Sequence, residues 1–255
     1  MSERPLLEAV VFDAGGTLVR LDFEWMAAVA REYGYCVAAD ALRRAELGGR
    51  RRYDASRARG DGPSPPLGGA GDVRDYFGGM LMAVGIPSSV IGTLVVRYLA
   101  RERQSGLWSR PNEGARAAID WVVAHGLRSA VVSNSDGRAE WHLRQSGVRA
   151  GLEFVVDSHL VGVEKPDPRI FAIALERLGV GAERALYVGD LRSVDEAGAR
   201  AAGMRFVLLD PDGGYANGAP HVASIAVLPE WIERHYRLSP ARAPLAPAPS
   251  RTEGS

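Results

Sequence analysis

The sequence predicts an α/β fold, a parallel sheet flanked by helices, with a helical insertion near the N-terminus. From residue 111 onward, helical patterns alternate with short apolar runs, which is typical of βαβ units and a parallel sheet. Between residues 21 and 104 the apolar residues keep a helical spacing and no strand pattern occurs. These two observations place one helical segment after the first strand and the remaining strands after that segment.

The first predicted strand covers residues 6–12 (LLEAVVF), because this run is short, apolar and β-branched and is followed by the glycines at 15 and 16. Residues 57–72 are rich in Gly and Pro and are predicted to form a loop. The spacing of apolar residues predicts helices on both sides of that loop, at 23–33, 38–47, 73–84 and 87–103. We therefore expect a helical cap over residues 20–106.

The rest of the chain is predicted to form the sheet and its helices. The helices are expected at 113–125, 138–146, 168–178 and 194–202, and the strands that follow them at 128–132, 154–156, 185–188 and 206–209. A last strand at 222–226 and a helix at 229–236 complete a core of residues 1–19 and 107–238. Residues 239–255 repeat Pro and Ala, which is typical of a disordered tail.

Composition and charge exclude several classes of protein. The chain has 31 Lys+Arg and 31 Asp+Glu, so it lacks the basic surplus that binding to nucleic acid requires. No apolar run reaches the roughly 18 residues that span a bilayer, and the N-terminus does not resemble a secretory signal. The single cysteine, Cys36, excludes an intramolecular disulfide. We expect a cytoplasmic protein with a small-molecule substrate and neither a nucleic-acid nor a membrane partner.

Polar side chains follow the predicted strands at the points where those strands end. They are Asp13, Ser133, Asn134, Asp190 with Asp195 five residues on, and Lys165, the only lysine of the chain, in the loop GVEKPDP. Because the carboxyl ends of parallel strands meet at one edge of a sheet, we expect these side chains to lie close together. The set offers a carboxylate nucleophile, donors for an anion, and oxygen ligands of the kind that Mg²⁺ prefers.

Four motifs in this order resemble the haloacid dehalogenase-like (HAD) hydrolase superfamily, in its subfamily I with a helical C1 cap. The motifs are FDAGGTL (12–18), VVSNSDG (131–137), VGVEKPDPRIF (161–171) and YVGDLRSVDEAGARAAGM (187–204). The resemblance covers about residues 7 to 236. It implies a Rossmann-like core and a Mg²⁺-dependent phosphatase that acts on a small phosphorylated metabolite through an aspartyl-phosphate.

The resemblance also implies a role for each motif residue. Asp13 is the expected nucleophile and Lys165 its catalytic partner, which also holds the phosphate. Thr17, Ser133 and Asn134 are expected to bind the substrate, although Asn134 fits a turn equally well. The expected ligands of Mg²⁺ are Asp13, the backbone carbonyl of Gly15, Asp190 and Asp195. Asp195 also fits an ordinary acid in the first turn of a helix.

Gly15 departs from the pattern of the family phosphatases, which have a second aspartate two residues after the nucleophile. That aspartate protonates the leaving group and then activates water, which is worth about 10²–10⁴ in rate. We therefore expect slow turnover of alkyl phosphates and a smaller loss for acyl phosphates. A non-catalytic phosphometabolite-binding protein is one alternative. A 2-haloacid dehalogenase, with Arg43 or Arg44 as the halide ligand, is another alternative. The fourth motif of the family's dehalogenases, however, lacks the metal-binding acids, whereas this chain has Asp190 and Asp195.

Some charged and titratable residues are expected to have ordinary roles. The arginines of the cap are expected to form a solvated helix face, from which one could meet an anionic substrate; they are Arg43, Arg44, Arg50, Arg51 and Arg52. His125, His142 and His159 lack metal-ligand spacing and are expected at the surface or in packing contacts.

Overall fold

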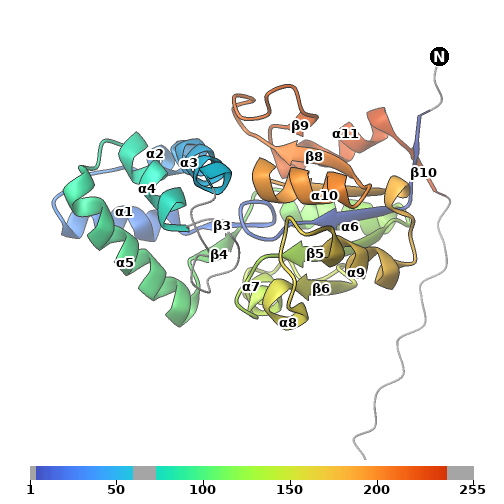
Figure 1. Ribbon diagram of the computed structural model, residues 1–255, viewed down its shortest axis with the longest axis horizontal. Helices are drawn as coiled ribbons and strands as arrows, with labels where there is room; N and C mark the ends of the chain where they lie inside the picture. The colour runs from blue at the N-terminus through green and yellow to red at the C-terminus, as the bar shows by residue number, and fades with distance from the viewer. Residues whose placement is uncertain (1–3, 60–72, 240–255) are drawn as a thin grey trace, which may run out of the picture.

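The computed structural model describes residues 4–59 and 73–239 (Figure 1). In these residues six strands form one parallel sheet in the order β6-β5-β2-β7-β8-β9, which confirms the predicted α/β fold. The strands are β2 (Ala9–Phe12), β5 (Arg128–Ser133), β6 (Phe154–Asp157), β7 (Ala185–Gly189), β8 (Arg205–Leu209) and β9 (His221–Val222). Residues 60–72 of the predicted loop at 57–72 and residues 240–255 of the predicted tail at 239–255 lie outside the described residues, and the loop prediction is wrong at 57–59, which are helical.

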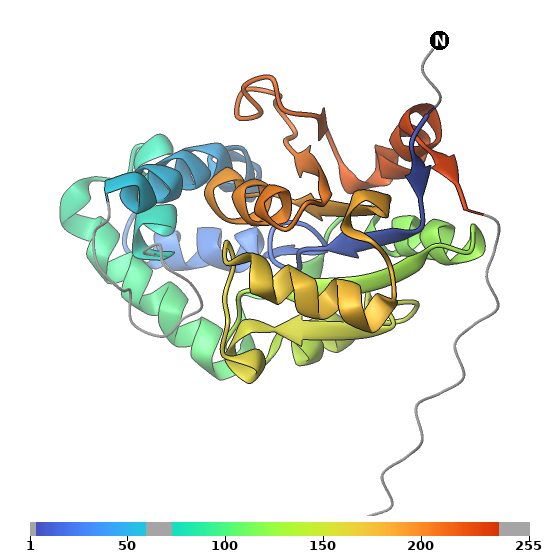
Figure 2. The same cartoon turned by 45° about the vertical axis from the view of Figure 1, so that its right-hand side comes forward.

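Strand β2 occupies the middle of the sheet and is buried on both faces. Val10 and Phe12 belong to one apolar cluster, and Ala9 and Val11 to the other, because successive side chains of a strand point to opposite faces. The first cluster includes side chains of α6 (Ala115–Ala124), α7 (Ala139–Gln145) and α11 (Leu228–His235). The second includes those of α9 (Pro168–Leu178) and α10 (Ala197–Ala201), so the sheet lies between two layers of helices (Figure 2).

Among the described residues, five further helices lie beside the sheet and share an apolar cluster of their own (Figure 1). They are α1 (Phe23–Glu32), α2 (Ala39–Arg44), α3 (Glu46–Arg59), α4 (Val73–Ala83) and α5 (Ser88–Ser105). Two short antiparallel strands, β3 (Val19–Leu21) and β4 (Trp108–Pro111), carry the chain out to these helices and back. The sequence showed no strand pattern for this pair. We interpret residues 20–106 as the cap and the sheet with its helices as the core.

The predicted helix at 38–47 is wrong in its extent, because α2 ends at Arg44 and α3 continues to Arg59. Two glycines of α3 explain why the helix forms there despite its polar sequence. A Cβ on Gly49 would lie 2.6 Å from the carbonyl oxygen of Tyr76, and one on Gly48 would lie 3.0 Å from that of Gly79. Small residues thus let α3 approach the backbone of α4, and this packing stabilises the helix.

Other boundaries also differ from the prediction. The predicted strand at 222–226 is only the two-residue β9, followed by a 3₁₀ turn at Ile225–Val227. The predicted helix at 194–202 begins with a π-helical turn at Arg192–Glu196. The structure adds β1 (Leu6–Leu7), which pairs with β10 (Arg237–Leu238), the short α8 (Ser158–Val161) and a 3₁₀ turn at Ala182–Arg184. In the described residues, every helix is too short or too polar to cross a membrane.

Candidate active site

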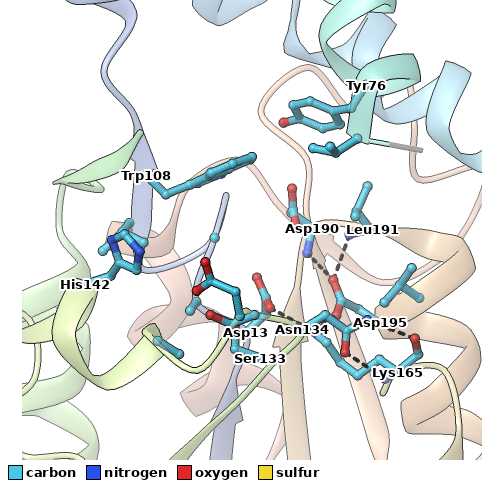
Figure 3. A pocket seen from close by; sticks show the side chains of 18 of the residues that line it. Asp13, Tyr76, Trp108, Ser133, Asn134, His142, Lys165, Asp190, Leu191 and Asp195 are labelled. Carbon is cyan, nitrogen blue, oxygen red and sulfur yellow. Dashed lines mark hydrogen bonds and ion pairs between the residues drawn. The ribbon is translucent and has the colours of Figure 1, made fainter. Parts of the chain in front are cut away.

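Lys165 lies at the centre of the polar groups at the carboxyl edge of the sheet (Figure 3). Its Nζ donates hydrogen bonds to Asp13 Oδ1 at 2.6 Å, to Asp195 Oδ1 at 2.7 Å and to the Tyr187 hydroxyl at 3.0 Å. These three bonds use all three protons of the ammonium group. Burial lowers the pKa of Lys165, but Asp13 and Asp195 together raise it well above its ordinary value. The lysine is therefore charged, and it holds two carboxylates in place.

Asp13 follows β2 directly, and its amide donates to the carbonyl of Val188 at 2.8 Å. The next turn is tight, since the carbonyl of Ala14 accepts bonds from the amides of residues 17, 18 and 19. Gly16 has φ +84° in this turn, and a Cβ there would lie 2.3 Å from Asp190 Oδ2. Only glycine meets both requirements. Burial raises the pKa of Asp13 from its ordinary 3.8 to about 6, and Lys165 opposes that rise.

Asp195 connects Lys165 to the end of β7. Its Oδ1 accepts the bond from Lys165, and its Oδ2 accepts from the amides of Asp190 and Leu191 at 3.0 and 2.9 Å. A Cβ on Gly189 would lie 2.5 Å from Asp195 Cγ, so glycine is required at the end of the strand. Asp195 is 1% exposed, which does not fit a solvated acid in the first turn of a helix. Its contacts position both the lysine and the loop that carries Asp190.

Arg50 of α3 reaches from the cap to Asp190. Its Nε lies 3.3 Å from Asp190 Oδ2, and its Nη1 donates to the carbonyl of Leu209 at 2.8 Å. The predicted solvated position is therefore wrong for Arg50, which is 4% exposed. The reason is that α3 packs over the ends of β7 and β8. Arg51 also crosses from cap to core, where it donates to the carbonyl of Gly214 at 2.8 Å.

The carboxylates of this site suit a divalent cation. Asp13, Asp190 and Asp195 each offer an oxygen, and these oxygens lie within 4.8 Å of one another. When ionised, these three carboxylates outnumber the two cations that face them, Lys165 and Arg50, and Arg50 also faces Glu46. Burial raises the pKa of Asp190 well above its ordinary value although Arg50 opposes it, as expected where positive charge is short. Carboxylate oxygens are also the ligands that Mg²⁺ prefers.

The three residues predicted to bind substrate have different surroundings. Ser133 ends β5 and lines the cavity beside Asp13. Thr17 is fully buried and does not line that cavity, and among the described residues its hydroxyl has no hydrogen-bond partner. Asn134 uses both ends of its amide on the backbone of Lys165: Nδ2 donates to the carbonyl at 2.9 Å, and Oδ1 accepts from the amide at 2.8 Å. The Asn134 side chain therefore positions the lysine.

Aromatic side chains form the wall of the cavity that faces these polar groups (Figure 3). The indole of Trp108, on β4, lies over Gly15, whose added Cβ would be 3.2 Å from Trp108 Cδ1 and 3.3 Å from Nε1. Tyr76 of α4 lies beside the indole, and its hydroxyl donates to Glu46 Oε1 at 2.7 Å. The space that a larger side chain at position 15 would enter is thus bordered by an indole ring.

His142 also lines the cavity, from α7. It is 7% exposed, and its Nε2 lies 3.4 Å from Glu102 Oε1. Glu102 lies near the end of α5, and its backbone carbonyl accepts a hydrogen bond from Arg138 Nη2 at 2.7 Å. The prediction of a surface or packing role for His142 did not include this place in the cavity wall. Sequence reasoning placed Arg50 on a solvated face and missed Trp108 and Tyr76, and none of the three belongs to a motif.

Comparison with known proteins is consistent with this arrangement. The model of the haloacid dehalogenase-like hydrolase family matches residues 7–203. The chain is 38% identical over 125 residues to haloacid dehalogenase-like hydrolase domain-containing protein 3 of Mus musculus, covering 49% of this chain and 50% of the relative. It is 35% identical over 104 residues to the glyceraldehyde 3-phosphate phosphatase of Methanothermobacter thermautotrophicus, covering 40% of this chain and 46% of that protein.

The chain thus spans about half the length of the curated relatives it matches. Among solved structures, a 2-haloacid dehalogenase from Pseudomonas syringae has the same fold, with a TM-score of 0.52 at 22% identity over 89% of this chain and 99% of that one. The fold alone therefore does not separate phosphatases from dehalogenases. Because the family model spans most of the sequence, the chain belongs to the haloacid dehalogenase-like hydrolase family.

Proposed function

We propose that this hydrolase is a Mg²⁺-dependent phosphatase that acts on a small phosphorylated metabolite through an aspartyl-phosphate at Asp13. The observation that carries the proposal is the 2.6 Å contact of Lys165 Nζ with Asp13, within a group of three carboxylates that suits a cation. One relative is named as a phosphatase of glyceraldehyde 3-phosphate, which supports a small phosphorylated substrate.

We also propose a cytoplasmic location, which suits the free and exposed Cys36.

In this proposal Asp13 is the nucleophile. Lys165 holds Oδ1, which leaves Oδ2 of the same carboxylate to attack phosphorus. The new O–P bond forms as the bond from phosphorus to the leaving oxygen breaks, and that oxygen takes the electron pair. The Ser133 hydroxyl donates to a phosphoryl oxygen, and bound Mg²⁺ would neutralise charge on the phosphoryl group. Water then attacks the aspartyl-phosphate, which releases phosphate and restores Asp13.

The residues proposed to hold Mg²⁺ are Asp13, Asp190 and the carbonyl of Gly15, with Asp195 supporting the site. Asp195 already gives both oxygens to Lys165 and to two amides, so its contribution is to position the other groups. Gly15 carries no acid to protonate a leaving group. We therefore expect faster turnover of acyl phosphates, whose leaving group needs no proton, than of alkyl phosphates.

The experiment that tests the proposal measures phosphate release from acetyl phosphate and p-nitrophenyl phosphate, with Mg²⁺ or with EDTA. The proteins are the wild type, Asp13→Asn, and Asp120→Asn as a control at an exposed carboxylate of α6. Release by the wild type and the control, with none from Asp13→Asn, supports aspartyl-phosphate chemistry. Equal release by Asp13→Asn would refute it.

Two other outcomes correspond to different functions. Binding of Mg²⁺ and phosphate without release would indicate a phosphometabolite-binding protein, a reading that the missing acid at Gly15 favours. Release of chloride from 2-chloropropionate would indicate a dehalogenase. The excess negative charge of the carboxylate group favours the phosphatase over the dehalogenase, because a dehalogenase needs no cation there.

A further inference from the structure

We propose that Trp108 determines which phosphates the site hydrolyses, because its indole N–H donates a hydrogen bond to the leaving oxygen. Its ring also forms the wall against which the leaving group lies. The substrates selected in this way have a planar leaving group of low basicity, that is, they are aryl or acyl phosphates. This inference rests on the proposed phosphatase function and narrows its substrate class.

The position of the indole is the first observation. Trp108 Nε1 lies 3.3 Å and Cδ1 3.2 Å from the place of a Cβ on Gly15, so the N–H edge of the ring borders the space above the turn after Asp13. Trp108 is half-buried and lines the cavity. Figure 3 shows the ring on one side of the cavity and Asp13, Ser133 and Lys165 on the other. In an in-line displacement the leaving oxygen lies opposite the nucleophile, which is the side of the indole.

The second observation is that this donor has no partner among the described residues and is held in place. Within the described part of the chain, no acceptor bonds to the indole N–H, whereas the neighbouring Tyr76 hydroxyl is committed to Glu46. The ring packs on Phe77 with centroids 5.7 Å apart and on Tyr76 with centroids 6.5 Å apart. Its backbone pairs with Leu21 across the β3–β4 ladder. A donor fixed by packing costs little reorganisation when charge develops in front of it.

The chemistry of an indole limits what this donor can do. An indole N–H donates a hydrogen bond but does not give up its proton near neutral pH. The leaving oxygen takes the electron pair of the broken P–O bond and departs as a phenolate, which solvent protonates after release, or as a carboxylate, which stays ionised. An alkoxide is too basic to leave in this way, whereas an aryl or acyl oxygen is not. Val19, Leu99 and Leu191 also line the cavity, and these apolar side chains suit the hydrocarbon part of such a leaving group.

Tyr53, on α3, is another aromatic side chain that lines the cavity. The three atoms nearest to the place of a Cβ on Gly15 all belong to Trp108, and none belongs to Tyr53. This difference makes Tyr53→Phe a suitable comparison for Trp108→Phe.

The experiment measures kcat/KM with Mg²⁺ for a series of substituted phenyl phosphates whose phenols differ in basicity. The proteins are the wild type, Trp108→Phe, Tyr53→Phe, and Trp121→Phe as a control at a half-buried tryptophan of α6 outside the cavity. Trp108→Phe keeps a ring but removes the donor. We expect it to lose about tenfold or more with phenyl phosphate, as for a hydrogen bond to a charged oxygen, and less than about threefold with p-nitrophenyl phosphate.

The value of kcat/KM should therefore fall more steeply with the basicity of the leaving phenol in Trp108→Phe than in the wild type. In Tyr53→Phe and Trp121→Phe this dependence should stay unchanged. An equal loss along the whole series would overturn the role of the N–H. The phosphatase function would still stand in that case, provided that release remains dependent on Asp13. Absence of release by the wild type, in contrast, is the failure of the proposed function.

A second measurement does not depend on turnover. The indole ¹H–¹⁵N signals of the five tryptophans are recorded in Asp13→Asn with Mg²⁺, before and after addition of phenyl phosphate. The signal that Trp108→Phe removes should move on addition of the ester, and the signal that Trp121→Phe removes should not. A stationary Trp108 signal at saturating phenyl phosphate would overturn the inference.

Discussion

The substitution Asp13→Asn should stabilise the metal-free protein at neutral pH. Burial raises the pKa of Asp13 from 3.8 to about 6, so the folded state favours the neutral carboxyl. That rise corresponds to about 3 kcal/mol between the two protonation states, or about 6–12 °C in Tm for a chain of this size. Asparagine resembles the neutral carboxyl at every pH and removes this cost.

The sign follows from the direction of the pKa change. The stability that a raised carboxyl pKa confers is fully present below pH 3.8 and is lost as the pH rises through about 6. Asp13→Asn should therefore exceed the wild type by up to about 3 kcal/mol at pH 7.5 and match it near pH 4. Mg²⁺ should reduce or reverse the difference, because the ionised wild-type site binds it more tightly than the Asp13→Asn site does.

The assay is thermal and urea unfolding in EDTA between pH 4 and pH 8, repeated with Mg²⁺. Asp120→Asn is the matched control, because Arg116 lowers the pKa of this exposed carboxyl and its removal should not stabilise the protein. An Asp13→Asn protein that is less stable than the wild type at pH 7.5, or a difference that does not change with pH, would refute the reasoning.

Three further substitutions test other parts of the site. Lys165→Met leaves two buried carboxylates without their shared cation. It should lower the free energy of unfolding, measured in urea, by about 3–5 kcal/mol at pH 7 and by less at pH 5. A loss that does not depend on pH would contradict this. Arg50→Met removes the positive charge beside the proposed metal ligands, so calorimetry should show that Mg²⁺ binds about tenfold more tightly. Arg52→Met, on the same helix and paired with Asp75 within the cap, should leave the affinity for Mg²⁺ unchanged. Gly16→Ala should destabilise the protein by more than the roughly 1–2 kcal/mol that alanine costs in a left-handed backbone conformation, because the added Cβ also meets the Asp190 carboxylate. Gly179→Ala is the control: it has φ +64° and no atom within 4 Å of the added Cβ, so it should show the backbone cost alone.

Much of the site was predictable from the sequence because strand ends mark it. The apolar run before Asp13 predicts a buried strand, and the carboxyl ends of parallel strands meet, so Asp13, Ser133 and Asp190 were expected together. The single lysine was prominent because every other basic residue is an arginine. The structure brings these groups together as expected, and their roles in catalysis remain predictions.

The contribution of the cap was not predictable in the same way. Arg50 is buried because of its contacts with Leu209 and Asp190, more than 130 residues away in sequence, and the polar α3 has no apolar stripe to show which face packs. Trp108 lies on a four-residue strand too short for a period to be recognised. Asn134 was assigned to substrate on its position alone, and only the fold shows that its amide holds the lysine backbone.

The most direct test of the account is detection of the phosphorylated aspartate. The protein is mixed with acetyl phosphate and Mg²⁺, quenched in acid, and weighed by intact-protein mass spectrometry, followed by peptide mapping. Because Gly15 supplies no base to activate water, the aspartyl-phosphate should accumulate. We expect one added phosphoryl group, on the peptide that contains Asp13, and none in Asp13→Asn. No added mass in the wild type at the shortest quench times, or the same mass in Asp13→Asn, would contradict it.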